Sequence, residues 1–169
     1  MAEFGVKYVY HIMESVRLMA KVAVGCDHGG YPLKDNVVSV LESLGAEVVD
    51  FGCDSTESVD YPKYGYKVAK AVASGECDLG VVMCGTGIGI SIAANKVKGV
   101  RAGLATNAFM AEMTRRHNNA NVLALGGRVV TPEEAKDIVT AWYNATYEGG
   151  RHQKRLDMIE EIEDIERND

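Results

Sequence analysis

The sequence predicts an α/β fold built on a five-stranded parallel sheet with helices on both faces. Short apolar runs alternate five times with segments of helical periodicity. The runs are rich in β-branched residues, are apolar at both alternating positions, and each ends at turn residues. Strands covered on both faces of a parallel sheet have this composition, and repeated strand–helix alternation is typical of a doubly wound sheet. The 169 residues therefore suit one Rossmann-like, three-layer domain.

Each expected element follows from this pattern. The predicted strands are Lys21–Cys26, Ala46–Asp50, Leu79–Cys84, Arg101–Thr106 and Val122–Leu125. The predicted helices between and after them are Tyr31–Leu44, Pro62–Ser74, Ile88–Asn95, Ala108–Arg116 and Pro132–Tyr143. The last of these has the best-marked start, because Thr131-Pro132-Glu133-Glu134 matches a capping box with proline at the first helical position.

The two ends of the chain stand apart from this alternation. Residues 1–18 are interpreted as an extension that is dispensable or a vector remnant, since Met19 can itself be a start; residues 19–169 form the functional domain. A charged helix is expected over Arg151–Arg167, with Ile159, Ile162 and Ile165 in one stripe. That stripe predicts packing on another subunit, so this C-terminal helix is expected to serve dimerisation.

Composition limits the function classes. The net charge of −6 and the lack of a dense basic run argue against a nucleic-acid surface. Charged residues interrupt the first 20 positions, so they do not form a signal peptide. The four cysteines stand singly, with no metal-type spacing, and predict a cytoplasmic protein with free thiols and no metal site. Three of them, Cys26, Cys53 and Cys77, are expected to be small core residues.

The segment Val81–Lys96 is the most informative for function. Four apolar residues lead into a turn that holds Cys84, Gly85, Thr86, Gly87 and Gly89, and a helical run follows. Alternate glycines let backbone N–H groups gather around one point, and a helix start adds unpaired N–H donors. Such a point stabilises an oxyanion or a phosphate, and here a thiol lies beside it. This turn is therefore predicted to be an active site.

Other interpretations of the glycines fail. The uncharged stretch Leu79–Asn95 is shorter than a membrane span and contains glycines, so a core strand followed by a buried helix is favoured. The spacing G-x-G-x-G differs from the dinucleotide fingerprint, and Ala105-Thr106 ends the next apolar run where an acidic residue is required. Gly25–Gly30 is followed by Tyr31-Pro32, which excludes a P-loop.

Polar residues follow four of the predicted strands at the edge where α/β sheets bind ligands. They are Asp27-His28, Cys84-Gly85-Thr86, Thr106-Asn107 with a helix that runs on to His117-Asn118, and Gly126-Gly127-Arg128. Near the C-terminus, Arg151 and Arg155 lie four apart, so one helix face can present both guanidinium groups to one target. Together with His28 and Arg128 they suggest a phosphate clamp.

Five separated motifs resemble, in order and spacing, ribose-5-phosphate isomerases of the B type. They are Gly25–Gly30, Asp60-Tyr61-Pro62, Cys84–Ser91, Arg116-His117-Asn118 and Tyr147–Gln153. The resemblance covers Lys21 to about Glu166, and the wider family includes galactose-6-phosphate isomerase subunits and enzymes of allose 6-phosphate. It implies cofactor-free interconversion of ribose 5-phosphate and ribulose 5-phosphate through an enediolate. It also implies a homodimer with sites shared between subunits, or a tetramer.

The same resemblance implies a role for each candidate residue. Family members use as base either a cysteine before the glycine loop or a glutamate within it, where this chain has Ile90; Cys84 is thus the expected base. His117 is expected to open the sugar ring, and Asp27 to contact the ring oxygen or a hydroxyl. Thr86 and Asn118 would bind hydroxyls or the enediolate, and Tyr61 would line the site. The remaining candidates are Gly85, Gly87 and Gly89 for the enediolate oxygen, and His28, Arg128, Arg151 and Arg155 for the phosphate, the last two from a neighbouring subunit.

Two alternatives stay open. The first is an isomerase of a hexose 6-phosphate such as allose or galactose 6-phosphate, including one subunit of a heteromeric enzyme. The second is a sugar-phosphate-binding regulator that keeps the clamp without turnover. The substrate or ligand is a small sugar phosphate in each case, and no nucleic acid or membrane partner is expected.

Overall fold

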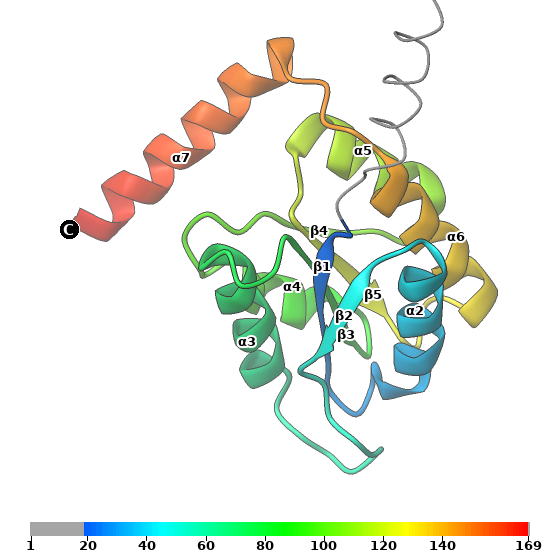
Figure 1. Ribbon diagram of the computed structural model, residues 1–169. Helices are drawn as coiled ribbons and strands as arrows, with labels where there is room; N and C mark the ends of the chain where they lie inside the picture. Colours follow the sequence, from blue (N-terminus) through cyan, green and yellow to red (C-terminus); the bar gives the residue numbers. More distant parts are fainter. Residues whose placement is uncertain (1–18, 169) are drawn as a thin grey trace, which may run out of the picture.

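The computed structural model describes residues 19–168, and the five expected strands form one parallel sheet in the order β2-β1-β3-β5-β4 (Figure 1). The strands are β1 (Lys21–Cys26), β2 (Glu47–Asp50), β3 (Leu79–Cys84), β4 (Ala102–Leu104) and β5 (Val122–Gly126). Val24 of β1 pairs with Asp50 of β2 on one side and with Val81 of β3 on the other. The chain therefore turns back at β1, so β1 and β3 flank the point where the strand order reverses.

The helices divide between the two faces of the sheet, as expected for three layers. They are α2 (Tyr31–Ser43), α3 (Tyr61–Ala73), α4 (Ile88–Ala94), α5 (Ala108–Asn118), α6 (Pro132–Asn144), the short 3₁₀ helix η1 (Gly150–His152) and α7 (Gln153–Asn168). One apolar core lies under α2, α5 and α6, and a second lies under α3 and α4. Successive residues of β3 alternate between them, with Met83 in the first core and Cys84 in the second. This is why the strands are apolar at both alternating positions.

The element boundaries confirm most of the sequence-based predictions. Thr131 Oγ1 accepts a hydrogen bond from the Glu134 N–H at 3.2 Å, and Glu134 Oε2 accepts one from the Thr131 N–H at 2.8 Å, which is the predicted capping box. Strand β4 is shorter than predicted because the Arg101 N–H donates to the Asn121 side chain instead of to a neighbouring strand. Helix α5 continues two residues beyond its predicted end, to Asn118.

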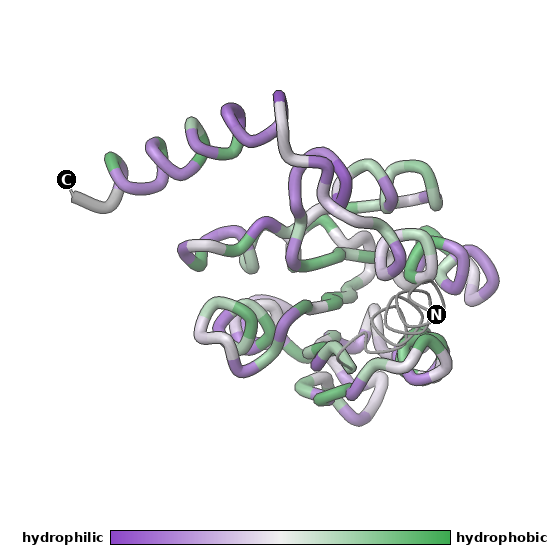
Figure 2. The backbone as a smooth tube through the Cα atoms, turned by 45° about the horizontal axis from the view of Figure 1, so that its top comes forward, coloured by the Kyte–Doolittle hydropathy of each residue, from purple (hydrophilic) through white to green (hydrophobic). Residues whose placement is uncertain are grey.

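Helix α7 projects from the rest of the domain (Figures 1 and 2). Leu156 is buried at its base, whereas Ile159, Ile162 and Ile165 are 48%, 60% and 62% exposed. The predicted stripe thus faces solvent in the single chain. No described helix is long and apolar enough to cross a membrane. The predicted extension, residues 1–18, lies outside the described residues.

Candidate active site

Three loops meet at the carboxyl edge of the sheet, beside the point where the strand order reverses. The Asp27 N–H after β1 donates to the Met83 carbonyl at 3.2 Å. On the other side, the Gly127 N–H donates to the Cys84 carbonyl at 2.8 Å, and the Arg128 N–H donates to the Gly85 carbonyl at 2.9 Å. These bonds join the loops that follow β1, β3 and β5 into one surface, at the position where doubly wound sheets bind ligands.

Two glycines allow the three loops to approach one another. A Cβ atom on Gly29 would lie 2.7 Å from the Gly85 nitrogen, and one on Gly127 would lie 2.2 Å from the Gly29 oxygen. Any larger residue at either position would force the loops apart. Gly87 has φ of +78°, a conformation that glycine adopts without strain. The glycines thus set the shape of the candidate site.

Cys84 lies buried at the centre of this surface, with 4% of its area exposed. Its Sγ accepts a hydrogen bond from the Gly87 N–H at 3.2 Å. A backbone donor aimed at sulfur stabilises negative charge there, and the thiolate is the basic form of cysteine. The turn therefore orients the thiol toward the glycine loop.

Asp27 has a structural task that the sequence did not reveal. It is 5% exposed, and its Oδ1 accepts hydrogen bonds from the N–H groups of Gly29 at 2.8 Å and Gly30 at 3.0 Å. Its Oδ2 lies 4.0 Å from His28 Nδ1. Only Oδ2 is thus left for the expected contact with a sugar, while Oδ1 holds the loop.

His28 is fixed by a bond from another segment. Its Nδ1 accepts a hydrogen bond from the Val59 N–H at 3.2 Å, so a neutral ring carries its proton on Nε2. The half-buried ring therefore offers an Nε2–H donor. This donor suits the expected phosphate contact.

Three exposed side chains complete the surface at this edge. A Cβ on Gly89 would lie 2.6 Å from Tyr61 Cζ, so the Tyr61 ring packs directly on the glycine loop. Arg128 lies over Gly85, with Nη1 3.3 Å from the place of a Cβ there. Thr86 Oγ1 accepts a weak bond from the Ile88 N–H at 3.3 Å. Nine predicted residues therefore gather here: Asp27, His28, Tyr61, Cys84, Gly85, Thr86, Gly87, Gly89 and Arg128.

His117 and Asn118 do not lie at this edge of their own chain. Helix α5 starts after β4 at the carboxyl edge and ends before β5 at the amino edge. Arg101, which precedes β4, donates from Nε to the Asn118 carbonyl at 3.1 Å. The end of α5 is therefore at the opposite side of the sheet. Arg151 and Arg155, both exposed, lie with it, because the Glu148 N–H donates to the Arg116 carbonyl at 3.0 Å.

Around His117, the chain brings together residues that the sequence analysis missed. The His117 and His152 rings stack with centroids 4.2 Å apart and planes 10° apart. Glu148 Oε2 lies 3.7 Å from His117 Nε2 and 3.6 Å from His152 Nε2. Arg116 donates from Nε to Glu148 Oε1 at 2.7 Å. Glu148 and His152 are more than 30 positions from His117, so no local spacing reveals the cluster.

The charges of this cluster affect one another. Hydrogen bonds from Arg116 hold the pKa of the Glu148 carboxyl below its usual range. Burial, together with the charges of His117 and Arg151, lowers the pKa of His152. His117, Glu148 and His152 could offer three atoms to a metal, all within 4.8 Å of one another. However, the neighbouring arginines disfavour a cation there.

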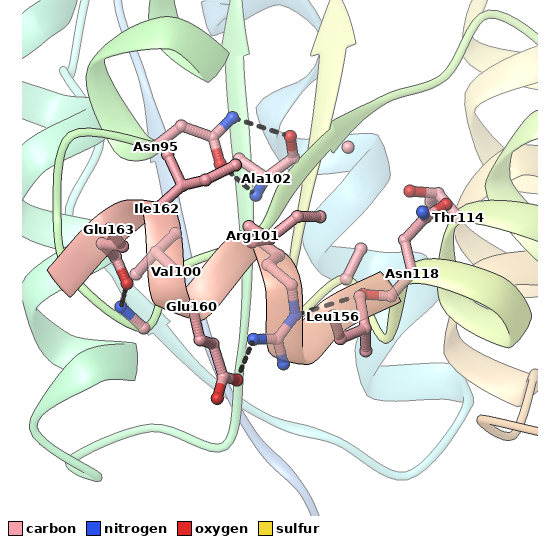
Figure 3. A pocket seen from close by; sticks show the side chains of 14 residues that line it. Asn95, Val100, Arg101, Ala102, Thr114, Asn118, Leu156, Glu160, Ile162 and Glu163 are labelled. Carbon is pink, nitrogen blue, oxygen red and sulfur yellow. Dashed lines mark hydrogen bonds and ion pairs between the residues drawn. The ribbon is translucent and has the colours of Figure 1, made fainter. Parts of the chain in front are cut away.

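A groove of about 460 Å³ separates α7 from the amino edge of β4 (Figure 3). Arg101 on its floor pairs with Glu160 of α7 at 3.6 Å, and the Gly99 N–H donates to Glu163 at 3.1 Å. Asn95 exchanges hydrogen bonds with the Ala102 backbone beside them. The groove contains neither Cys84 nor His28. The contacts across the groove hold α7 in place, and they also fix the position of Arg151 and Arg155 near its start.

Comparison with known proteins gives a consistent family. The model of the family described as "Ribose/Galactose Isomerase" matches residues 22–159. The chain is 54% identical over 145 residues to "Ribose-5-phosphate isomerase B" of Escherichia coli K12, covering 86% of this chain and 97% of that protein. The structure of Clostridium thermocellum ribose-5-phosphate isomerase B matches with a TM-score of 0.84 and 58% identity, covering 85% and 97%. That of Mycoplasma genitalium, "with bound Ribulose-5-phosphate", matches with a TM-score of 0.81 and 41% identity, covering 85% and 96%.

Proposed function

The chain belongs to the ribose/galactose isomerase family, and we propose that it interconverts ribose 5-phosphate and ribulose 5-phosphate as a cofactor-free aldose–ketose isomerase. The observation that carries the proposal is the Cys84 thiol, which receives the Gly87 N–H inside a glycine loop at the ligand-binding edge. Ile90 is fully buried and packs toward Gly65, so the loop has no carboxylate at the alternative position of the base. Both features favour a cysteine base.

The proposed reaction moves one proton between neighbouring carbons. The Cys84 thiolate takes the C2 proton of the open-chain aldose, the electrons of that bond form a C1–C2 double bond, and the carbonyl electrons move to O1. Return of the proton to C1 and transfer of the O2 proton to O1 give the ketose. General-base catalysis contributes roughly 10²–10⁴-fold. Loop N–H groups of Gly85 and Gly89 would stabilise the enediolate oxygen, one such donor being worth about 10²–10³-fold, while the Gly87 N–H stays on Cys84.

The remaining groups at the carboxyl edge bind and orient the sugar phosphate in this proposal. His28 offers its Nε2–H, and Arg128 its guanidinium, to the phosphate. Thr86 is exposed beside Cys84 and would bind a sugar hydroxyl, while Tyr61 lines the loop. Asp27 keeps the loop in shape through Oδ1 and has Oδ2 left for the sugar.

The proposed enzyme is a homodimer whose sites combine both edges of the sheet. Cys84 of one subunit would meet His117, Asn118, Arg151 and Arg155 of its partner, because α5 carries His117 and Asn118 away from the carboxyl edge of their own chain. Exposed apolar side chains supply a surface for association. They are Ile88, Ile92 and Phe109 near the carboxyl edge, and Met158, Ile159, Ile162 and Ile165 on α7.

The proposal also includes the bounds of the domain and the location of the protein. Residues 19–169 form the isomerase domain, and residues 1–18 are an extension to it. The four cysteines are free and buried, which supports a cytoplasmic location.

The first test compares kcat/KM for ribose 5-phosphate, allose 6-phosphate and galactose 6-phosphate in EDTA. We expect a clear preference for ribose 5-phosphate. Preference for a hexose phosphate would support a second candidate function, that of a hexose 6-phosphate isomerase. The description of the matching family favours this candidate because it includes galactose. Tight binding without turnover of any of the three would refute the isomerase and leave the regulator.

The second test addresses the shared site. Chains with Cys84→Ala are mixed with chains in which Arg151 and Arg155 are both alanine, and subunit exchange is verified separately. A mixed dimer has one site that keeps Cys84 and both arginines, so activity should partly return. No rescue despite proven exchange would show that each site is built from one chain.

A further inference from the structure

The cluster of Arg116, His117, Glu148 and His152, here called the Glu148 cluster, has a geometry that the reaction above does not explain. We propose that Glu148, held in place by Arg116, positions His117 for opening the sugar ring, with His152 as its stacking partner. Arg116, Glu148 and His152 are thus positioning residues. The inference rests on the proposed function, in which His117 acts on the substrate.

The Glu148 carboxylate is oriented from one side. Arg116 donates from Nε to Oε1 at 2.7 Å, its Nη2 pairs with the same oxygen, and its backbone carbonyl accepts the Glu148 N–H at 3.0 Å. These contacts leave Oε2 facing the two imidazoles. The distance of 3.7 Å from Oε2 to His117 Nε2 is an electrostatic contact, longer than a hydrogen bond. Arg116 also keeps Glu148 ionised, since its hydrogen bonds lower the pKa of that carboxyl.

The two imidazoles of the cluster differ in burial. The His152 side chain is 8% exposed, and its Nε2 is buried without a hydrogen-bond partner among the described residues. Its burial and the positive groups around it, His117, Arg151 and Arg155, lower its pKa, and Glu148 only partly opposes them. The His117 side chain is 34% exposed and shares the same carboxylate oxygen. His117 is therefore the imidazole of this pair that a sugar can reach.

The stacked rings also fix how His117 is presented. The planes lie within 10° of each other, so the buried His152 ring sets the plane of the His117 ring. With Nε2 turned to Glu148, Nδ1 is the nitrogen left to reach a sugar. In ring opening, Nδ1–H gives its proton to the ring oxygen as the bond from C1 to that oxygen breaks. The proton of the C1 hydroxyl leaves to water as the carbonyl forms, and water then reprotonates the imidazole.

The test uses the difference in ring chemistry between the two sugars. Ribose 5-phosphate is a furanose, whereas ribulose 5-phosphate stays open because its O5 is esterified. Single-turnover rates are measured with the full chain in excess over each sugar. For Glu148→Gln we expect the rate with ribose 5-phosphate to fall about tenfold or more, as for loss of a general acid. The rate with ribulose 5-phosphate should stay within about threefold, because the Cys84 step is unchanged.

A matched control separates this effect from simple loss of an ion pair. Glu112 also binds Arg116, with Nη1 to Oε1 at 2.7 Å, and among the described residues it makes no hydrogen bond or ion pair with His117. Glu112→Gln should keep the wild-type ratio of the two rates.

The outcomes distinguish the positioning role of Glu148 from the proposed isomerase activity. Equal losses with both sugars in Glu148→Gln, or the same selective loss in Glu112→Gln, would overturn the positioning role. Arg116→Gln releases the carboxylate without altering Glu148, so it must reproduce the selective loss and serves if Glu148→Gln does not fold. Wild-type protein inactive on both sugars would instead refute the proposed isomerase itself.

Discussion

Replacing Cys84 separates its chemical task from its structural one. Cys84→Ser keeps an acceptor for the Gly87 N–H, now 3.2 Å from sulfur, but replaces the thiol with a hydroxyl that holds its proton far more tightly. Cys84→Ala removes the acceptor as well. If the thiolate is the base, both variants lose about 10²–10⁴-fold in kcat, which corresponds to about 2.7–5.5 kcal/mol of transition-state stabilisation.

The two variants should differ in stability. Cys84→Ala leaves the buried Gly87 N–H without its acceptor, which costs about 1–3 kcal/mol. At about 2–4 °C per kcal/mol for a domain of this size, its Tm should fall visibly below that of Cys84→Ser. The assays are steady-state turnover of ribose 5-phosphate, thermal unfolding, and binding of the sugar phosphate, which should persist. Wild-type-like turnover in either variant would refute the thiol base. Equal Tm values would refute the structural role of the Sγ contact.

Three further predictions follow from the fold and the site. Arg151→Ala should raise KM for ribose 5-phosphate about tenfold or more with little change in kcat, as for a lost phosphate contact, and a reduced kcat at unchanged KM would contradict this. Because burial lowers the pKa of His152 in the folded chain, the wild type should lose stability as pH falls below about 6.5, where the unfolded chain binds the proton first. His152→Gln should lose less, and Tm values at pH 8 and pH 5.5 in both proteins check this; an identical drop would argue against it. Thr131→Ala removes the N-cap of α6 and should cost about 1 kcal/mol in urea unfolding, unlike the exposed control Thr56→Ala.

The sequence predicted the features that depend on local chemistry. Apolar residues on both sides of β3 indicated a strand between two cores, and Met83 and Cys84 do lie in different cores. The capping box at Thr131 marked the start of α6 because its bonds span only three residues. The turn after Cys84 was also predictable, because glycines permit tight turns, and Gly87 has a φ of +78° that glycine adopts without strain.

Long-range geometry set the limit of these predictions. His117 was grouped with Cys84 because its helix follows a strand that ends at the ligand-binding edge, but that helix returns to the opposite edge before β5 begins. The stack of His117 on His152 depends on the turn through Gly149 and Gly150, both with positive φ, which brings two distant segments together. Asp27 is a third case. The sequence predicted that it belongs to the site, whereas the hydrogen bonds that it accepts from the Gly29 and Gly30 N–H groups depend on how the loop folds.

The separation of the two edges gives the proposed dimer a chemical reason. The carboxyl edge of one chain holds a base and an oxyanion loop, and its own imidazole, His28, is assigned to the phosphate, whereas His117 lies at the opposite edge. A single chain could thus act on an open sugar but would lack the group assigned to opening the ring. Because the Glu148 cluster lies beside η1 and the start of α7, association through the exposed isoleucines of α7 would bring that group and both arginines together. Assembly and ring opening are then linked through one C-terminal segment, and isomerisation of the cyclic sugar should depend on assembly more strongly than proton transfer on the open one.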